Sequence, residues 1–330
     1  VFTRLAVAAA VVAAVLSAAT LTQAAQSPEQ ILTASGVKGG LVVHLGCGDG
    51  EETAKLRLNE RYLVQGLNMD AAKVQAARKR LNAMGLGGKV TVRRCDGKSL
   101  PYADNLVNAI ISTGPTKMPE AEILRVLTPL GVALINGRTI TKPRPDAIDE
   151  WTHYLHGPDN NAVAADAVVG IPRRMQWLGK PKFARAHEQL ASLSACVTTG
   201  GRVFYIIDEA PRADIRFPAR WFLVARDAFN GVVLWKREMG EWVDQLRRFR
   251  AGPAGTCFRL AAVDERVYVT LDIDDPVSVL DAATGKTLAT CEATAHARQI
   301  LRIDDTLVVL TDTAPQTSEG NDSSIRRGRK

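Results

Sequence analysis

The residues best suited to chemistry in this 330-residue chain form a short glycine-rich stretch, Gly46-Cys-Gly-Asp-Gly50. The stretch follows an apolar run, Leu41–Leu45, and precedes a segment, Glu51–Leu56, that suits a helix. This order predicts a strand, a tight turn and a helix start. Glycine has no Cβ, so a ligand can lie against bare backbone, and the free N–H groups of the next helix favour polar or anionic groups. A ligand-binding loop is therefore expected, with an unoccupied glycine-rich turn as the alternative.

The rest of the first part of the chain alternates between strand and helix patterns. After the loop, residues 61–68 and 89–94 are predicted strands, and residues 71–84 between them have apolar side chains at helical spacing. Further elements are expected as a helix over 27–36, a strand over 107–112, a helix over 119–127, a turn at 130–131 and a strand over 132–136. This alternation predicts a doubly wound, mostly parallel α/β sheet within a domain spanning residues 27–140.

Ligands of such sheets bind at the carboxyl ends of the strands. Four segments follow the ends of four predicted strands, so they are expected to meet at one edge of the sheet. The residues predicted to bind a ligand there are Gly46, Cys47, Gly48, Gly50, Asn68, Asp96, Gly97 and Ser112.

The glycine pattern G-x-G-x-G after an apolar strand resembles motif I of the class I S-adenosylmethionine-dependent methyltransferases. Two later segments also resemble that family: residues 96–105 match its D-(G/A)…L-P-(F/Y) segment, and residues 122–131 match its E-x-x-R-V-L-x-P helix and turn. The resemblance covers roughly residues 30–140. It implies a Rossmann-like methyltransferase fold, with the glycine loop around the methionine part of S-adenosylmethionine and Asp96 near the adenine amine.

Two positions depart from the family pattern. The first strand usually carries an acidic residue two places before the first glycine, where this chain has His44. The second strand usually ends in an acidic residue that binds both ribose hydroxyls, where this chain has Asn68, with Asp70 two places further on. Loss of the charged acceptor costs about 1–2 kcal/mol. No catalytic base is identified, but proximity and orientation can suffice for transfer. Both an active enzyme and a degenerate domain remain open.

The composition changes at Lys142-Pro-Arg-Pro145, which predicts a linker and an irregular segment over residues 141–190. Short β-branched runs separated by turns then indicate an all-β domain over residues 191–313. The clearest predicted strands are 202–207, 221–225, 232–235, 266–271, 277–280 and 306–311.

Two turns in this second domain, beginning at Asp227 and Asp281, share the pattern D-A-x-(N/T)-G-x-x-L. With Trp235, the pattern resembles the β-propeller repeats of the pyrroloquinoline-quinone (PQQ) type, in which it docks one blade on the next. Blades need about 40–50 residues each, so the segment holds about three or four and predicts a partial propeller. PQQ itself is not expected as a cofactor, because neither a calcium site nor a full ring is evident.

The two ends of the chain concern the cellular location of the protein and disorder, and they lie outside the two predicted domains. Residues 1–25 have the short positive region, apolar run and small residues of a secretory signal peptide, so export to the periplasm is expected. If that segment is not cleaved, it would anchor the protein in the membrane. Export weighs against a methyltransferase, because S-adenosylmethionine is made inside cells. Residues 314–330 are polar and predicted to be disordered.

The charge, cysteine and histidine content argues against two further functions, nucleic-acid binding and metal binding. The net charge of +7 comes from scattered basic residues, so nucleic-acid binding is not expected. The five cysteines contain no C-x-x-C pair and the five histidines no metal-ligand spacing, so no metal site is expected.

The leading hypothesis is an exported methyltransferase-like domain fused to PQQ-like propeller repeats, acting on an unidentified methyl acceptor. The alternative is a catalytically degenerate scaffold that binds a protein partner through the propeller. A fragment of a quinoprotein dehydrogenase is the least favoured.

Overall fold

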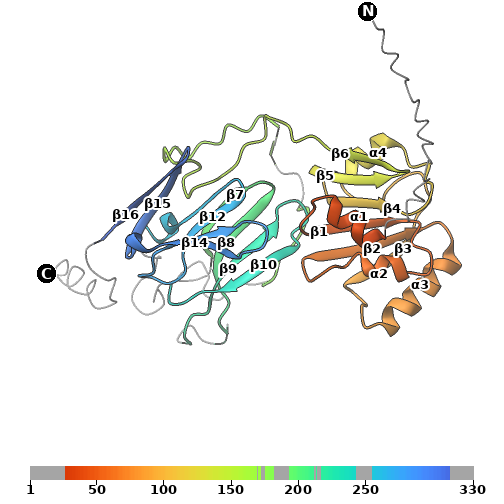
Figure 1. The fold of residues 1–330 in the computed structure, drawn as a ribbon, viewed down its shortest axis with the longest axis horizontal. Helices are drawn as coiled ribbons and strands as arrows, with labels where there is room; N and C mark the ends of the chain where they lie inside the picture. The colour runs from red at the N-terminus through yellow and green to blue at the C-terminus, as the bar shows by residue number, and fades with distance from the viewer. Residues whose placement is uncertain are drawn as a thin grey trace, which may run out of the picture.

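The computed structural model describes residues 27–168, 170–171, 175–181, 193–211, 213, 217–242 and 255–312. These residues form an α/β domain and an all-β domain that lie side by side (Figure 1). The predicted signal peptide, residues 1–25, and the predicted disordered tail, residues 314–330, lie outside the described residues. Within the described part of the chain, no helix combines the length and apolar character needed to cross a membrane.

The α/β domain is built on a six-stranded sheet with the order β3-β2-β1-β4-β5-β6. Its strands are β1 (Gly40–Leu45), β2 (Tyr62–Asn68), β3 (Val90–Arg94), β4 (Val107–Ser112), β5 (Leu127–Ile135) and β6 (Arg138–Thr141), and its helices are α1 (Pro28–Ala34), α2 (Glu51–Lys55), α3 (Ala71–Ala83) and α4 (Glu120–Val126). Strands β1 to β5 are parallel and β6 is antiparallel to β5. The predicted doubly wound, mostly parallel sheet is confirmed.

Strand β1 lies at the centre of the sheet, and all six of its residues are buried. Because side chains alternate along a strand, β1 contributes to two cores. Val42 packs into the core that includes residues of α1, α2 and α3. Leu41, Val43 and Leu45 pack into the opposite core, which includes residues of α4. Burial on both faces explains why this strand reads as a continuous apolar run.

The carboxyl-terminal part of the sheet differs from the prediction in two ways. Strand β5 begins at Leu127, so the turn expected at residues 130–131 lies inside it, with Leu130 at a left-handed φ of 63° and a register shift against β4. Strand β6 was not predicted. It folds back through Asn136-Gly137, whose φ values of 53° and 73° are those of a tight hairpin. An Asn-Gly pair favours this turn because both residues tolerate positive φ.

The all-β domain consists of antiparallel sheets whose strands follow one another in sequence order. The first has the order β10-β9-β8-β7, the second has the order β11-β12-β13-β14, and the third is the pair β15-β16. The strands are β7 (Leu193–Thr199), β8 (Arg202–Asp208), β9 (Trp221–Asp227), β10 (Val233–Glu238), β11 (Leu260–Val263), β12 (Arg266–Thr270), β13 (Val277–Asp281), β14 (Thr287–Cys291), β15 (Ala297–Ile303) and β16 (Thr306–Thr311). The six clearest predicted strands are present, whereas β7, β11, β14 and β15 were not predicted. The sheets do not form a closed ring within the described residues.

The two repeated turns have the same local structure. Asp227 Oδ1 accepts the N–H groups of Phe229 and Asn230 at 2.9 and 3.0 Å, and Asp281 Oδ1 accepts that of Thr284 at 2.7 Å. The glycine of each turn has a φ of 72° or 71°. The sequence pattern therefore predicted these turns correctly, because Asp satisfies the free N–H groups and glycine supplies the positive φ.

Trp235 of β10 packs on the second turn. Its Nε1 donates to the carbonyl oxygen of Ala282 at 2.9 Å, and a Cβ on Gly285 would lie 2.6 Å from the indole ring. Only glycine leaves room for the ring at that point. Trp235 is 9% exposed and belongs to the core shared by the first two sheets.

Trp177 makes the same contact with the first of the two repeated turns, which begins at Asp227. Its Nε1 donates to Ala228 O at 2.9 Å, and a Cβ on Gly231 would lie 2.4 Å from its ring. Trp177 lies within the predicted linker, residues 141–190, and this contact was not predicted. Two consecutive turns thus receive a tryptophan in the same way.

The segment after the α/β domain crosses the first strands of all three sheets. Trp151 exchanges hydrogen bonds with Thr198 of β7, and the Ala262 N–H of β11 donates to Thr152 O at 2.9 Å. The N–H of Arg302 in β15 donates to Nε2 of His153 at 3.0 Å. Three successive residues therefore tie three successive sheets together.

The two domains meet at the amino ends of the parallel strands. Asn108, the second residue of β4, donates from Nδ2 to Asp227 Oδ2 at 2.6 Å. Its Oδ1 accepts from Asn230 Nδ2 at 2.7 Å and from the Leu41 N–H at 2.8 Å. The carboxyl ends of the same strands point away from this junction, so the all-β domain does not cover them (Figure 1).

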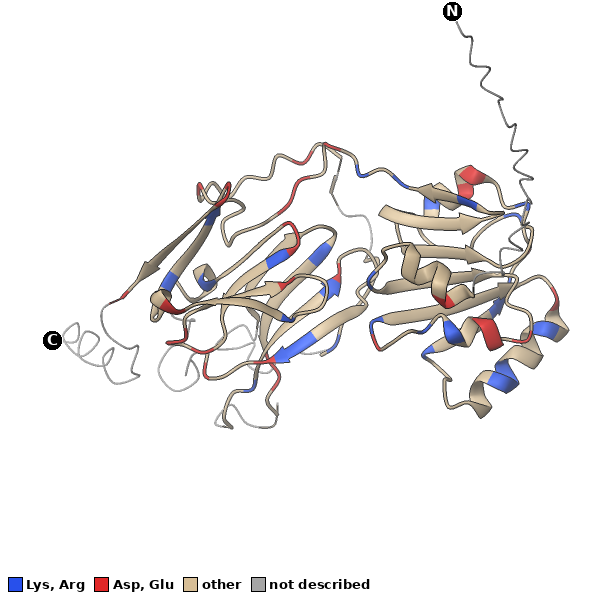
Figure 2. Ribbon diagram, viewed as in Figure 1, with Lys and Arg blue, Asp and Glu red and all other residues tan. Residues whose placement is uncertain are grey.

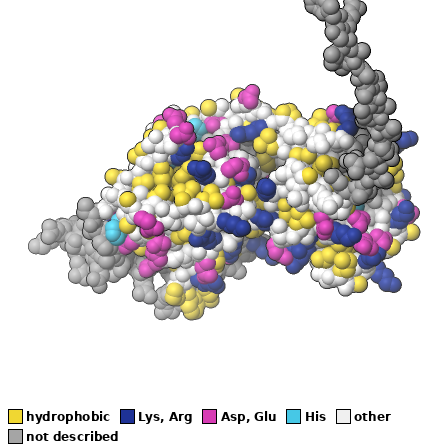
Figure 3. Space-filling view, viewed as in Figure 1, with side chains coloured by type: hydrophobic (Ala, Val, Ile, Leu, Met, Phe, Trp, Pro, Cys, Tyr) yellow, Lys and Arg dark blue, Asp and Glu magenta, His cyan; other side chains and the backbone are white. Residues whose placement is uncertain are grey.

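Charged side chains are distributed over both domains (Figure 2). On the face seen in Figure 3, basic and acidic side chains are interspersed.

Truncating Trp235 should destabilise the all-β domain. We expect Trp235→Ala to lower the free energy of unfolding by about 3–5 kcal/mol, because it removes a buried ring from a site that cannot collapse fully. Trp235→Phe keeps an aromatic ring and loses the hydrogen bond to Ala282, so it should cost about 1 kcal/mol from that bond, plus a smaller packing loss. Chemical denaturation followed by circular dichroism measures both. An unchanged midpoint for Trp235→Ala would contradict the docking role.

Candidate functional site

The glycine loop connects the end of β1 to the start of α2. Gly46, Gly48 and Gly50 all have left-handed backbone conformations, with φ values of 77°, 53° and 90°. A Cβ on Gly46 or Gly48 would meet nothing within 4 Å, so the loop is open above these two residues. A Cβ on Gly50 would lie 3.1 Å from that of Ala77 in α3. Gly50 therefore serves helix packing, whereas Gly46 and Gly48 present bare backbone to a ligand.

The other predicted site residues lie along the same edge of the sheet. Ser112 is paired in register with Leu45, the last residue of β1. Asn68 ends β2, beside β1, and accepts at its backbone carbonyl from the Cys95 N–H at 3.0 Å. Asp96 and Gly97 come directly after Cys95 in the chain. Because the strands are parallel, the structure brings together all four loops expected at the carboxyl edge.

Asn68 and Asp70 are engaged in local hydrogen bonds. Asn68 Oδ1 accepts from the Asp70 N–H at 2.9 Å. Asp70 is the N-cap of α3 and accepts from Ala72 N at 2.8 Å and Lys73 N at 3.4 Å. Asp70 therefore caps the helix through Oδ1, and the neutral Asn68 occupies the place of the usual acidic residue.

Asp96 and Gly97 form a turn covered by a methionine. Asp96 accepts from the N–H groups of Lys98 and Ser99 at 2.8 and 2.9 Å, and these bonds lower the pKa of its carboxyl. A Cβ on Gly97 would lie 2.5 Å from Sδ of Met69, whose side chain is 63% exposed. Met69 was not among the predicted site residues, since an apolar residue after a strand carries no distinctive signal.

Cys47 is a buried thiol within the loop. Burial raises the pKa of Cys47 to about 11, so the thiol is protonated at neutral pH. It packs against Gly66 of β2, where a Cβ would lie 2.7 Å from the Cβ of Cys47. Cys47 and Cys95 are both free thiols. In this loop Cys47 is a packing residue and lacks the thiolate character of a nucleophile.

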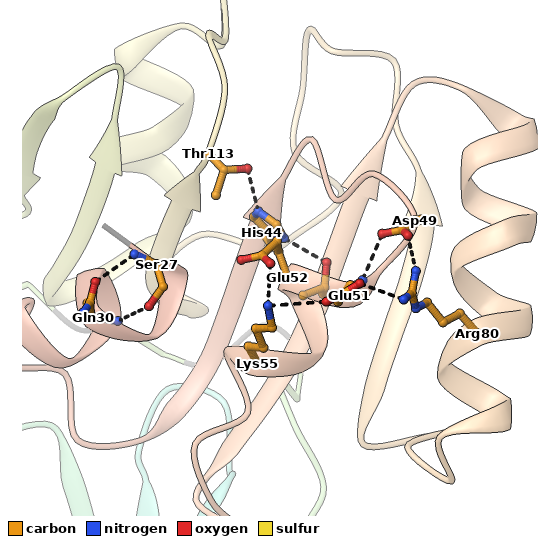
Figure 4. A network of polar contacts seen from close by, with 10 residues as sticks. Ser27, Gln30, His44, Asp49, Glu51, Glu52, Lys55, Arg80 and Thr113 are labelled. Carbon is orange, nitrogen blue, oxygen red and sulfur yellow. Dashed lines mark hydrogen bonds and ion pairs between the residues drawn. The ribbon is translucent and has the colours of Figure 1, made fainter. Parts of the chain in front are cut away.

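His44 lies beneath the loop and joins two of its neighbours (Figure 4). The side chain is 1% exposed, with Nδ1 2.8 Å from Thr53 Oγ1 of α2 and Nε2 3.2 Å from Thr113 Oγ1 after β4. Burial lowers the pKa of His44 to about 4, despite the opposing effect of nearby Glu52. The imidazole is therefore neutral at pH 7 and donates to one hydroxyl while accepting from the other.

The acidic side chains around the loop are paired with bases (Figure 4). Arg80 of α3 contacts Asp49 and lies 2.7 Å from Glu51. Lys55 lies 2.7 Å from Glu52 and 3.5 Å from Glu51. Such exposed pairs contribute little stability individually, but together they link the loop and α2 to α3 and neutralise much of the local charge.

Two hollows of about 150 and 240 Å³ lie elsewhere, between the two domains at the amino ends of the strands. Both are lined by Pro129, Leu130 and Arg202, and neither includes a residue of the Gly46–Gly50 loop. The glycine loop and the other predicted binding residues lie at the opposite, carboxyl edge of the sheet. We take that edge as the candidate site, because ligands of open α/β sheets bind there. Among the described residues, no group of three or more His, Cys, Asp or Glu side chains is arranged to hold a metal ion.

Comparison with known proteins shows a likeness within the α/β domain. A family model described as "Methyltransferase domain" matches residues 42–131, which include the glycine loop. This part of the chain is thus methyltransferase-like, in agreement with the strand order and the glycine spacing. No curated protein matches the chain.

Several solved structures resemble the same part of the chain. A proposed S-adenosyl-L-methionine-dependent methyltransferase from Methanococcus maripaludis is 20% identical over 32% of this chain and 51% of its own, with a TM-score of 0.29. A proposed sarcosine dimethylglycine methyltransferase from Galdieria sulphuraria is 23% identical over 34% and 45%, with a TM-score of 0.30. Geranyl diphosphate C-methyltransferase from Streptomyces coelicolor A3(2) is 20% identical over 32% and 42%, with a TM-score of 0.29. The chain covers about half or less of each structure.

His44 should make the protein less stable in acid. Its pKa in the folded state, about 4, is below the value of 6.5 for a free side chain, so the unfolded state takes up the proton first. The stability contribution is complete above pH 6.5 and is lost as the pH falls toward 4. At pH 5 the loss amounts to about 2 kcal/mol.

The matched variant is His44→Asn, which cannot titrate. We expect the difference in unfolding free energy between the wild type and this variant to be about 2 kcal/mol smaller at pH 5 than at pH 7. His153, whose pKa burial also lowers to about 4, is present in both proteins and its effect cancels. Urea denaturation at the two pH values measures the difference; an equal gap at both would show that His44 is not held neutral by burial.

Proposed function

We propose that the α/β domain binds S-adenosylmethionine at the Gly46–Gly50 loop and transfers its methyl group to an acceptor that remains to be identified. The observation that carries this proposal is the conformation of the loop. Gly46 and Gly48 are left-handed and uncovered, and they directly follow β1, the strand beside which the strand order of the sheet reverses. Ligands of open α/β sheets bind at such a switch point, and the loop lies within the segment matched by the methyltransferase model.

In this proposal each predicted site residue has a defined task. Gly46 and Gly48 lie along the methionine part of the cofactor, with Cys47 and Gly50 supporting the loop. Asp96 accepts from the adenine amine, next to Gly97 and Met69, and Asn68 lies near the ribose. Ser112 lies at the end of β4, beside the loop. The bound cofactor would supply an activated methyl group, and the protein would contribute position and orientation.

We further propose that the all-β domain is an incomplete propeller of the PQQ type that binds a protein partner, and that the protein is exported to the periplasm. The repeated contact of Trp177 with Gly231 and of Trp235 with Gly285 supports the propeller assignment. The pattern of residues 1–25 supports export. PQQ is not part of this proposal.

A catalytically degenerate scaffold is the second candidate. It is favoured by Asn68, a neutral residue at the place of the usual acid, and by the local hydrogen bonds of Asn68 Oδ1 and Asp70 Oδ1 to backbone N–H groups. In that case the α/β domain would be retained for its packing against the all-β domain through Asn108.

Titration calorimetry of the full chain with S-adenosylmethionine tests the proposal. We expect micromolar binding that Gly48→Asp reduces at least tenfold, because the new side chain enters the open space above the loop. Gly85→Asp is the matched control. Gly85 also has a positive φ, 69°, and no atom within 4 Å of a Cβ, but it follows α3 at the other edge of the sheet.

The control should bind as the wild type does. Equal losses in both glycine variants would point to general strain rather than a local site. No binding at millimolar cofactor would rule out the cofactor site and leave the scaffold as the better account.

A further inference from the structure

The second strand of the α/β sheet ends in a neutral residue. Asn68 is the last residue of β2. In dinucleotide-binding α/β sheets an acid in this region binds the ribose 2′ hydroxyl, and a nearby arginine accommodates a 2′-phosphate instead. A carboxylate at position 68 would repel such a phosphate, whereas the amide of Asn68 is uncharged and has N–H groups that can donate to phosphate oxygens. The end of β2 is therefore compatible with a ribose that carries a phosphate.

An arginine lies directly beside Asn68. Arg94, the last residue of β3, pairs in register with Asn68, and its Nε donates to Met69 O at 3.1 Å. This bond holds the guanidinium against the residue that follows Asn68. Arg94 is exposed and makes no ion pair with any described residue. Its terminal N–H groups are thus available to an anion near the end of β2, and a guanidinium can bind phosphate through two of them at once.

The balance of charge differs between the two sides of the site. Segments 68–73 and 93–98, at the ends of β2 and β3, have four exposed bases and two exposed acids: Lys73, Arg93, Arg94 and Lys98, with Asp70 and Asp96. The glycine loop and its neighbours have three acids and two bases (Figure 4): Asp49, Glu51 and Glu52, with Lys55 and Arg80. An anion is therefore favoured beside β2 and β3 and disfavoured beside the glycine loop.

We infer that this site binds adenosine that carries a phosphate on the 2′ or 3′ hydroxyl of its ribose, with Arg94 as the residue that binds the phosphate. The inference goes beyond S-adenosylmethionine, whose ribose has no phosphate, and it rests on the proposed function only for the position of the adenosine. The two ligands share the nucleoside part of the site and compete for it. Arg94 determines specificity and takes no part in bond making.

Titration calorimetry of the full chain with four ligands tests the inference. Adenosine 2′-phosphate and 3′-phosphate carry the charge on the ribose, adenosine 5′-phosphate carries the same group toward the glycine loop, and adenosine has no phosphate. We expect the 2′- or the 3′-phosphate to bind about tenfold tighter than adenosine. The 5′-phosphate should bind no tighter than adenosine, because its phosphate lies on the side where acids are in excess. S-adenosylmethionine should displace the ribose phosphate.

Three variants assign the effect to residues. Arg94→Gln should bring the ribose phosphate to within about threefold of adenosine and leave adenosine itself unchanged. Arg93→Gln is the matched control: it removes the same charge from the neighbouring position of β3, but consecutive side chains of a strand lie on opposite faces of the sheet, so the preference should stay within about threefold of wild type. Asn68→Asp should reverse the preference, because a carboxylate accepts from ribose hydroxyls and repels phosphate. Circular dichroism establishes that each variant is folded.

The other outcomes separate this inference from the proposed function. If all three phosphates bind equally, or none binds tighter than adenosine, the inference is wrong, while binding of S-adenosylmethionine would still support the proposed function. An unchanged preference in Arg94→Gln would show that Arg94 does not bind the phosphate. If a ribose phosphate binds as expected and S-adenosylmethionine neither binds nor competes, the proposed function fails and the inference stands. If none of the five ligands binds, both fail.

Discussion

The burial of β1 on both faces is the constraint on which the rest of the α/β domain depends. Val42 and Val43 enter opposite cores, so helices must cover both sides of the sheet. The strand order reverses beside β1, and the chain leaves this strand through the glycine loop. The position of the candidate site is therefore a consequence of how the central strand is packed. Gly50 shows the connection directly, because its missing side chain allows Ala77 of α3 to approach the loop.

The junction between the domains uses the opposite ends of the same strands. One of the two repeated turns provides the contact: Asp227 and Asn230 both bond to Asn108. In the second turn, Thr284 takes the place of Asn230 and its hydroxyl donates to Asp281 at 2.6 Å, within its own turn. Burial raises the pKa of Asp227, and the amide of Asn108 offsets part of that effect. Asn230 thus distinguishes the turn that joins the two domains from the second turn, where Thr284 bonds within the turn itself. This arrangement leaves the carboxyl edge free for ligands.

The sequence predicted the parts of the fold that depend on local periodicity and turn chemistry. The parallel strands, the long helix α3 and the two Asp–Gly turns belong to this group. Strand β6 was not predicted, because its four residues are too few for a clear alternating pattern, although Asn136-Gly137 is a hairpin signal. Trp177 was not predicted because it does not stand four residues after the glycine of an Asp–Gly turn, the spacing that marks Trp235, and its partner turn lies 51 residues further along the chain. The use of Asp70 as a helix cap could be read from the sequence, since Asp before a helical pattern is a common N-cap; its consequence for Asn68 required the structure.

The backbone shape of the glycine loop does not depend on the charge of the residue at position 44. A positive φ at three of five positions requires glycine, since each L-residue there would cost about 1–2 kcal/mol. The backbone bonds from Gly46 and Cys47 to Leu67 then fix the loop on β2. None of these features depends on the residue at position 44 being acidic. A histidine is accommodated because Thr53 and Thr113 satisfy both ring nitrogens, so the imidazole stays buried and neutral. The backbone geometry of the loop is therefore compatible with a buried, neutral residue at position 44.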